Sequence, residues 1–92
     1  MIKTFARKDA KALFDGESVR CFINIEKAAR RKLELLEAAT VLDELRVPPG
    51  NRLEALKGGR KGQHSIRIND QFRVCFRWSE GHAYDVEICD YH

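Results

Sequence analysis

The last three residues of the sequence bring together three groups that can do proton chemistry. Asp90 supplies a carboxylate, Tyr91 a phenol, and His92 an imidazole that can take up or release a proton near neutral pH. If a strand continued through them, side-chain alternation would place Tyr91 opposite Asp90 and His92, so the three groups need not converge. A histidine at a chain end is commonly frayed and without a role. The triplet alone is therefore compatible with a catalytic group or with an idle end of the chain.

Positive charge is concentrated in the stretch before the triplet. Residues 52–77 are strongly basic, whereas residues 78–92 contain acidic residues and no basic one. The basic residues are Arg52, Lys57, Arg60, Lys61, Arg67, Arg73 and Arg77, and the two acids among them are Glu54 and Asp70. Guanidinium groups bind phosphate through paired hydrogen bonds, so this stretch suits a polyanion. Arg67, Arg73 and Arg77 could equally pair with Asp85 and Glu87 across strands. The loop cations have no equal number of acids nearby and favour phosphate contact; they are Arg52, Lys57, Arg60 and Lys61.

The cysteine and histidine pattern predicts neither a metal centre nor a cofactor. Cys21, Cys75 and Cys89 are an odd number without CxxC spacing, so neither a zinc site nor a disulfide framework is indicated. Cys75 and Cys89 could meet across a hairpin, where we expect reduced thiols. No carboxylate cluster or histidine pair has metal-ligand spacing, and no glycine-rich phosphate loop joins a strand to a helix.

Residues 71–92 predict a β-hairpin that would position this chemistry. Apolar and polar residues alternate on both sides of a glycine-containing turn at residues 79–82. One face should pack in the core, and its residues are Phe72, Val74, Phe76, Trp78, Tyr84, Val86 and Ile88. The opposite face should carry Arg73, Cys75, Arg77, Asp85, Glu87 and Cys89.

The preceding sequence predicts an α+β arrangement. The expected elements are a strand at residues 1–5, a helix at 7–14, a connector at 17–23, an amphipathic helix at 24–38, a short helix at 41–46, a basic loop at 51–62 and a strand at 64–68. Asn24 should cap the amphipathic helix, and Thr40 with Asp43 has the spacing of a capping pair for the short helix. The last strand and the hairpin would form a three-stranded antiparallel meander, covered by two or three helices.

Length and composition limit the architecture to one small domain, residues 1–92. Of the 92 residues, 43% are apolar, and the aromatic residues are one Trp, two Tyr and five Phe, enough for a single modest core. The net charge of +3 is mild, so the average charge alone does not argue for nucleic acid. The N-terminus lacks the apolar run of a signal peptide, and no apolar stretch approaches about 18 residues, so we expect a cytoplasmic protein without a membrane span.

Three blocks of the sequence resemble the HigB-like toxins of the RelE/ParE superfamily, in particular the GraT-type host-inhibition proteins. They are MIKTF at the start, PPGNRLEALKGGRKGQHSIRINDQFRVCFRW in the middle and VEICDYH at the end. The blocks span most of the second half of the chain, and the order of strands and helices fits the whole. The resemblance implies a RelE-like fold and a toxin of a type II toxin–antitoxin system.

The activity implied by the resemblance is ribosome-dependent cleavage of messenger RNA by an endoribonuclease that needs no metal or cofactor. In such enzymes the 2′-hydroxyl of the RNA attacks the adjacent phosphate and releases a 5′-hydroxyl. The reaction needs a proton acceptor, positive charge at the phosphate and a proton donor for the leaving oxygen. The implied partners are a helix-turn-helix antitoxin, which would make any contact with operator DNA, and the ribosome with its message.

Residue by residue, the resemblance assigns roles to the basic stretch and to the final triplet. The implied catalytic residues are Lys57, Arg73, Asp90, Tyr91 and His92, and the residues expected to contact RNA are Arg52, Glu54, Arg60, Lys61, Arg67 and Arg77. Lys57 and Arg73 would stabilise phosphate charge, and His92 would transfer a proton. Some HigB toxins have a histidine where this chain has Glu54, so Glu54 could accept the proton or the activity could be weaker.

Two other function classes remain open. The same superfamily fold also hosts gyrase inhibitors that lack these residues, so the fold alone does not decide between RNA cleavage and non-nucleolytic binding. A purely structural subunit, whose exposed apolar patch serves a partner, is the second alternative. Cleavage of ribosome-bound message, compared with inhibition of DNA supercoiling by gyrase, discriminates the first two classes.

Overall fold

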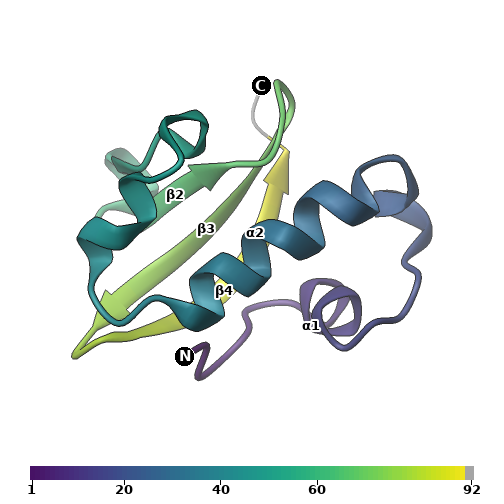
Figure 1. The fold of residues 1–92 in the computed structure, drawn as a ribbon, viewed down its shortest axis with the longest axis horizontal. Coiled ribbons are helices and arrows are strands. Elements are labelled where there is room, and N and C mark those ends of the chain that lie inside the picture. The colour runs from purple at the N-terminus through teal and green to yellow at the C-terminus, as the bar shows by residue number, and fades with distance from the viewer. Residues whose placement is uncertain (91–92) are drawn as a thin grey trace.

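Helices α1 and α2 pack on one face of an antiparallel sheet in the computed structural model, which describes residues 1–90 (Figure 1). The elements are α1 (Lys8–Phe14), η1 (Arg20–Ile25), α2 (Glu26–Ala38), η2 (Leu42–Arg46), η3 (Pro49–Asn51), β1 (Glu54–Ala55), η4 (Gly58–Arg60), β2 (His64–Arg67), β3 (Phe72–Ser79) and β4 (His82–Asp90), where η denotes a 3-10 helix. Across these described residues the sheet has four strands in chain order, β1-β2-β3-β4. The predicted α+β fold is confirmed.

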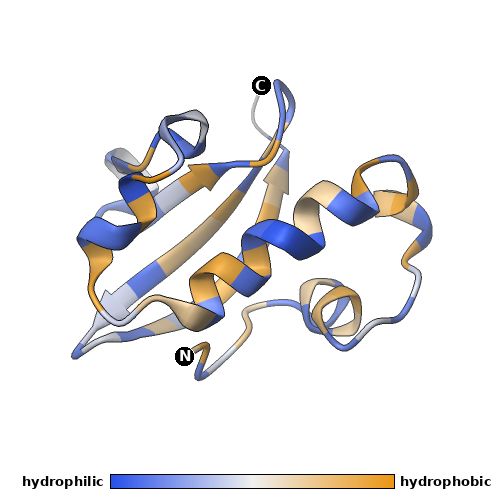
Figure 2. Ribbon diagram, viewed as in Figure 1, coloured by the Kyte–Doolittle hydropathy of each residue, from blue (hydrophilic) through white to orange (hydrophobic). Residues whose placement is uncertain are grey.

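The hydrophobic core lies between α2 and the sheet. Ala29, Leu33 and Leu36 form the buried stripe of α2 that the sequence period predicts, and they share one core with Val74 and Phe76 of β3. Figure 2 shows apolar and polar residues alternating along α2 and along the long strands. Burial of this stripe stabilises a helix of this length more than its intrinsic propensity does. No helix among residues 1–90 has the length and apolar character needed to cross a membrane.

The start of α2 differs from the prediction. The 3-10 helix η1 runs directly into α2, so Ile25 takes the N-cap position and forms no side-chain cap hydrogen bond. Asn24 is therefore not the cap, and that prediction was wrong. Phe22 and Ile25 are buried, and their packing fixes the entry into α2 without a polar cap.

The capping contact of η2 also differs by one residue from the prediction. Glu44 accepts hydrogen bonds from the backbone N–H groups of Thr40 at 2.7 Å and Val41 at 3.0 Å, and from the Thr40 hydroxyl at 2.8 Å. The hydrogen bonds from Val41 and Thr40 lower the pKa of Glu44. The predicted Thr40–Asp43 pair was wrong because η2 begins at Leu42, which makes Glu44 its third residue.

The β3–β4 hairpin turns where the sequence predicts. Ser79 pairs with His82, and the two residues between them close the turn. Glu80 has φ of 50° and Gly81 has φ of 81°, the left-handed conformation that a two-residue hairpin turn of this type requires at both positions.

A β-bulge in β4 changes the face on which Tyr84 lies. Cys75 pairs with Glu87 and Arg77 pairs with Tyr84, so β4 has one residue more than β3 over this stretch. Asp85, with φ of 52°, lies in the bulged stretch. Paired residues point to the same side of a sheet, so Tyr84 shares the face of Arg77. The prediction that Tyr84 faces the core was wrong, because the alternation of apolar and polar residues does not show where a bulge adds a residue to a strand.

The first six residues run beside β4 in the parallel direction. Two isolated bridges, Ile2 with Ala83 and Phe5 with Val86, stand where the sequence predicted a continuous strand at residues 1–5. The backbone hydrogen bonds between the two segments are 2.8–3.1 Å long. Asp85, in the bulged stretch of β4, lies between the two bridges and interrupts the pairing.

The predicted basic loop, residues 51–62, contains short elements of its own. Glu54 and Ala55 form β1, which pairs with β2 and extends the predicted meander by one strand. The Leu56 N–H donates to the Gln63 carbonyl at 2.9 Å, and this hydrogen bond closes the loop on itself. The basic loop therefore has short elements and hydrogen bonds of its own and projects from the edge of the sheet.

Candidate nucleic-acid interface

The polar face of the sheet, which is the side turned away from α2, carries the basic residues that the sequence singles out. In β3 this face presents Arg73, Cys75 and Arg77, because side chains alternate along a strand. Their paired residues on β2 and β4 are Ser65, Arg67, Tyr84, Glu87 and Cys89. Ser65 and Cys75 are fully buried, so the middle of this polar face is covered.

Arg73 connects the polar face to the start of the basic loop. Its Nε donates to Ser65 Oγ at 2.7 Å, and its Nη2 donates to the carbonyl oxygen of Arg52 at 2.8 Å. Arg73 is only 7% exposed, which is unusual for an arginine and reflects these contacts. Arg52 itself adopts a left-handed conformation with φ of 46° where η3 ends. Arg73 therefore holds the backbone at the point where the basic loop begins.

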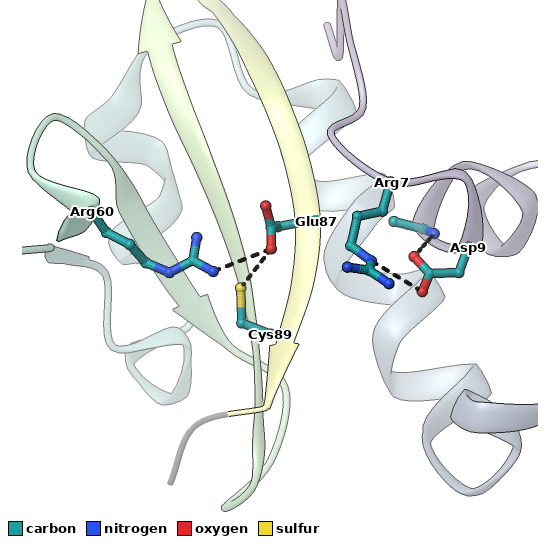
Figure 3. A network of polar contacts seen from close by, with 6 residues as sticks. Arg7, Asp9, Arg60, Glu87 and Cys89 are labelled. Carbon is teal, nitrogen blue, oxygen red and sulfur yellow. Dashed lines mark hydrogen bonds and ion pairs between the residues drawn. The ribbon is translucent and has the colours of Figure 1, made fainter.

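Arg60 connects the far end of the basic loop to β4. Its guanidinium donates to Glu87 Oε1 at 3.2 Å and to Gln63 Oε1 at 3.0 Å. The same Glu87 oxygen accepts a hydrogen bond from the Cys89 thiol at 3.4 Å. Figure 3 shows Arg60 extending from its loop across to Glu87 and Cys89 on β4. Arg60, expected to contact RNA, is thus engaged in an ion pair with the sheet.

The thiols of Cys75 and Cys89 lie close to this ion pair. Cys89 pairs with Arg73 and Cys75 pairs with Glu87, so the two cysteines are diagonal neighbours on the polar face. The neighbouring Cys89 side chain lowers the pKa of Cys75, against the effect of burial, and the positive charge of Arg60 acts in the same direction. The neighbouring Cys75 side chain and burial raise the pKa of Cys89. Both cysteines are free, as is Cys21.

Lys57 lies in the basic loop, between β1 and η4. It is exposed at the start of η4, and it lines a hollow of about 380 Å³ together with Glu54, Leu56 and Arg60. Glu54, which the resemblance singles out as a possible proton acceptor, lines the same hollow as Lys57. Lys61, the other lysine of the loop, is also exposed. A carboxylate and an ammonium group in one hollow can serve as a proton acceptor and a phosphate contact.

Two of the remaining arginines expected to contact RNA are paired with carboxylates. Arg67 forms an ion pair with Asp70, and Arg77 forms one with Asp85 at 3.3 Å. The side chains of Arg77 and Asp85 are each about half exposed, so water screens this pair strongly. The Arg77–Asp85 pair bears out part of the alternative in which strand arginines pair with Asp85 and Glu87, whereas Arg67 pairs with Asp70, three residues further along, and Glu87 pairs with Arg60.

Asp90 marks the end of the described part of β4, opposite Phe72. It accepts a hydrogen bond from Gln71 Nε2 at 3.0 Å. Asp90, Arg60, Glu87 and Cys89 line one side of a second hollow of about 340 Å³, and residues of α1 and η1 line the other side. Figure 3 shows Arg7 and Asp9, which pair at 3.5 Å, on the α1 side of β4. The predicted catalytic residues Tyr91 and His92 lie outside the described residues.

Sequence reasoning missed a residue that fixes the start of the basic loop. Asn51 is fully buried, and its Nδ2 donates to the carbonyl oxygens of Leu45 at 3.1 Å and Val47 at 3.3 Å. Its Oδ1 accepts a hydrogen bond from Lys32 of α2. Burial lowers the pKa of Lys32. In the sequence, an asparagine after Pro-Pro-Gly indicates only a turn. Nothing in the spacing of residues indicates that Asn51 joins α2 to the loop.

A family model described as the RelE-like toxin of the type II toxin–antitoxin system HigB matches residues 3–92. A relative named Toxin HigB-1, from Vibrio cholerae serotype O1, is 53% identical over 65 residues, which cover 71% of this chain and 68% of that protein. A relative named Endoribonuclease HigB, from Proteus vulgaris, is 34% identical over 98 residues and is covered fully, as is this chain.

Solved structures with the same fold include toxins of the YoeB type from Staphylococcus aureus. The YoeB–YefM heterotetrameric toxin–antitoxin complex contains a chain that matches with a TM-score of 0.62 and 21% identity, covering 100% of this chain and 98% of that chain. The YoeB dimer matches with a TM-score of 0.56 and 20% identity, covering 99% and 97%. At this identity the likeness concerns the fold alone.

Proposed function

Because the chain belongs to the HigB family of RelE-like toxins of type II toxin–antitoxin systems, we propose that it is an endoribonuclease that cuts messenger RNA on the ribosome and so stops growth. The family match and the Proteus vulgaris relative named an endoribonuclease support the reaction class. One observation supports a place for this activity in the fold. The basic loop and the end of β4 meet at one hollow, which Arg60 and Asp90 line together.

The proposed reaction is a transesterification within the RNA. The 2′-oxygen forms a bond to phosphorus while the bond from phosphorus to the 5′-oxygen breaks, which leaves a cyclic phosphate and a 5′-hydroxyl. A base removes the proton of the 2′-hydroxyl, and an acid gives a proton to the departing 5′-oxygen. Cationic side chains stabilise the charge that accumulates on the phosphate oxygens.

The residues proposed for these roles come from the basic loop and the end of the sequence. Lys57 contacts the phosphate, and His92 transfers a proton. Tyr91 stacks on or orients a base, while Asp90 positions a neighbour or shares the proton transfer. Glu54, in the hollow that Lys57 lines, is the second candidate for the proton acceptor. The proposal gives Arg73 a double role, since its charge lies near the reacting phosphate and its hydrogen bonds fix the loop.

The proposal includes partners and a place of action. The toxin works in the cytoplasm on translating ribosomes, and a helix-turn-helix antitoxin neutralises it and makes the contacts with operator DNA. The family is one of toxin–antitoxin pairs, which supports an antitoxin partner. The residues proposed to contact the RNA backbone are Arg52, Arg60, Lys61, Arg67 and Arg77.

A translation reaction built from purified ribosomes tests the proposal. With end-labelled message, we expect fragments carrying a cyclic phosphate or its hydrolysed product, and we expect them only while the message is being translated. Lys57→Ala should lower the cleavage rate, and the control Lys27→Ala, on the exposed side of α2, should not. Intact message together with inhibition of gyrase supercoiling would contradict the proposal and favour a non-nucleolytic toxin.

A further inference from the structure

The basic loop is joined to the sheet at its start and again through Arg60. At its start, Arg73 holds the Arg52 carbonyl, and only two residues of β1 pair with β2. Beyond β1 the loop carries Lys57 and three glycines, Gly58, Gly59 and Gly62, which give the backbone little intrinsic stiffness. The Leu56–Gln63 hydrogen bond closes the loop on itself, and the side chain of Arg60 joins the second half of the loop to β4.

Glu87 receives that contact. It lies on the polar face of β4, and its carboxylate accepts hydrogen bonds from Arg60 at 3.2 Å and from the Cys89 thiol at 3.4 Å (Figure 3). The Glu87 side chain is 20% exposed, so the pair is less screened by water than the Arg77–Asp85 pair farther along the same strands. The Arg60–Glu87 contact joins segments 27 residues apart, unlike the local pairs within α1 or η2.

We propose that Glu87 is a positioning residue, whose ion pair with Arg60 holds the loop segment 57–60 over β4 and so places Lys57 at the reacting phosphate. This inference rests on the proposed endoribonuclease function. It adds a residue with no part in the transesterification itself. It also changes the role of Arg60, which acts here through Glu87 rather than through a direct contact with RNA.

The two roles of Arg60 predict opposite effects of removing Glu87. If Arg60 positions the loop, Glu87→Ala releases the loop, and the single-turnover cleavage rate at saturating ribosomes falls about 10- to 100-fold, because small misplacements of catalytic groups are costly. If Arg60 contacts RNA directly, Glu87→Ala frees a cation for the message, and cleavage is unchanged or faster. Glu87→Gln keeps a hydrogen-bond acceptor for Arg60 and should retain an intermediate rate.

The experiment is a double-mutant cycle of Arg60→Ala and Glu87→Ala, measured as single-turnover cleavage of ribosome-bound message. We expect each single variant to be slowed and the double variant to be no slower than the slower single one, because both changes remove the same contact. Asp43→Asn, which removes the acid of the exposed Arg46–Asp43 pair, is the matched control and should cleave at the wild-type rate. Thermal melting and binding of the antitoxin should remain within the wild-type range for every variant.

Two results would overturn the positioning role while leaving the proposed function intact. One is a wild-type cleavage rate in Glu87→Ala, and the other is a double variant whose loss is the product of the two single losses. Amide hydrogen exchange of residues 57–62 gives a readout independent of activity, and we expect faster exchange in Glu87→Ala than in Asp43→Asn. Absence of cleavage by the wild-type protein would overturn the proposed function, and the positioning role with it.

Discussion

At the scale of single residues, four of the cations predicted to meet RNA fall into two groups. Arg73 and Arg60 are engaged with the protein itself, and each holds one end of the basic loop. Lys57 and Lys61 are exposed in that loop. Charge density in the sequence cannot separate these groups, because a buried arginine and an exposed lysine contribute equally to it. Substitutions in the two groups should therefore affect stability and cleavage differently.

Arg73→Lys should destabilise the protein as well as slow cleavage. A lysine cannot donate in two fixed directions to Ser65 Oγ and the Arg52 carbonyl, so at least one buried hydrogen bond is lost. The expected loss in free energy of unfolding is about 1–3 kcal/mol. Urea denaturation measures it, with Ser65→Ala as the matched variant that removes one bond and keeps the charge. An unchanged unfolding midpoint in Arg73→Lys would contradict the anchoring role.

Lys57→Ala should separate activity from stability. Because Lys57 is exposed, the change in free energy of unfolding should stay within about 0.5 kcal/mol, while cleavage of ribosome-bound message falls by about ten-fold or more. Urea denaturation and single-turnover cleavage of the same preparation measure the two quantities. Lys61→Ala is the control for the charge of the loop, and it should lower the cleavage rate less than Lys57→Ala does. Equal cleavage by Lys57→Ala and the wild type would remove Lys57 from the catalytic group.

At the scale of elements, periodicity predicts what is buried and fails where the chain departs from a regular repeat. The buried stripe of α2 and the turn of the β3–β4 hairpin follow from the sequence pattern. The face of Tyr84 does not, because the bulge adds one residue to β4. Nor does the start of α2, since the packing of Phe22 in η1 replaces a polar cap.

The candidate site shows the same limit of sequence reasoning. The basic loop and its position in the chain were predicted, because charge and glycine content are local properties of the sequence. The contacts that fix the loop join residues far apart in the chain, such as Arg60 with Glu87 and Lys32 with Asn51. A single sequence carries no signal for such pairs beyond opposite charge, and that signal did not choose between Arg60 and the strand arginines as the partner of Glu87.

Asn51→Ala should destabilise the connection between α2 and the basic loop. The substitution removes the donor for two carbonyl groups and the acceptor for Lys32, all at a fully buried position. We expect a loss in free energy of unfolding of at least about 2 kcal/mol, because buried polar groups lose their partners. Chemical denaturation measures this loss, with the exposed Asn24→Ala as control. A loss as small as that of Asn24→Ala would show that the Asn51 hydrogen bonds contribute little.

The start of η2 should respond to acid. Hydrogen bonds from Val41 and Thr40 hold the pKa of Glu44 below its ordinary value of 4.5, so the folded state favours the carboxylate. The stabilisation is present above pH 4.5 and is lost as pH falls through the lower pKa of the folded state. Melting temperatures of the wild type and Glu44→Gln should therefore differ at pH 7 and converge as the pH falls below 4.5. A difference that stays constant between pH 7 and pH 3 would contradict the capping role.

At the scale of the whole molecule, the sheet turns one face to the core and the other away from the helices. Helices α1 and α2 cover the apolar face, while the basic loop reaches over part of the polar face from the edge strand (Figure 1). The arrangement brings positive charge to the end of β4, where Asp90 precedes the last two residues of the sequence. Membership of the HigB family supports a toxin's activity for the chain, and we propose that this activity lies on the polar face.

Primer extension on messenger RNA from cells briefly expressing the chain tests the central claim most directly. Cells expressing His92→Ala provide the comparison, with the amount of protein matched by immunoblot. We expect cuts within translated codons in the wild-type sample and their absence in the His92→Ala sample. Growth inhibition without such cuts, or cuts that persist in His92→Ala at the wild-type level, would contradict the account.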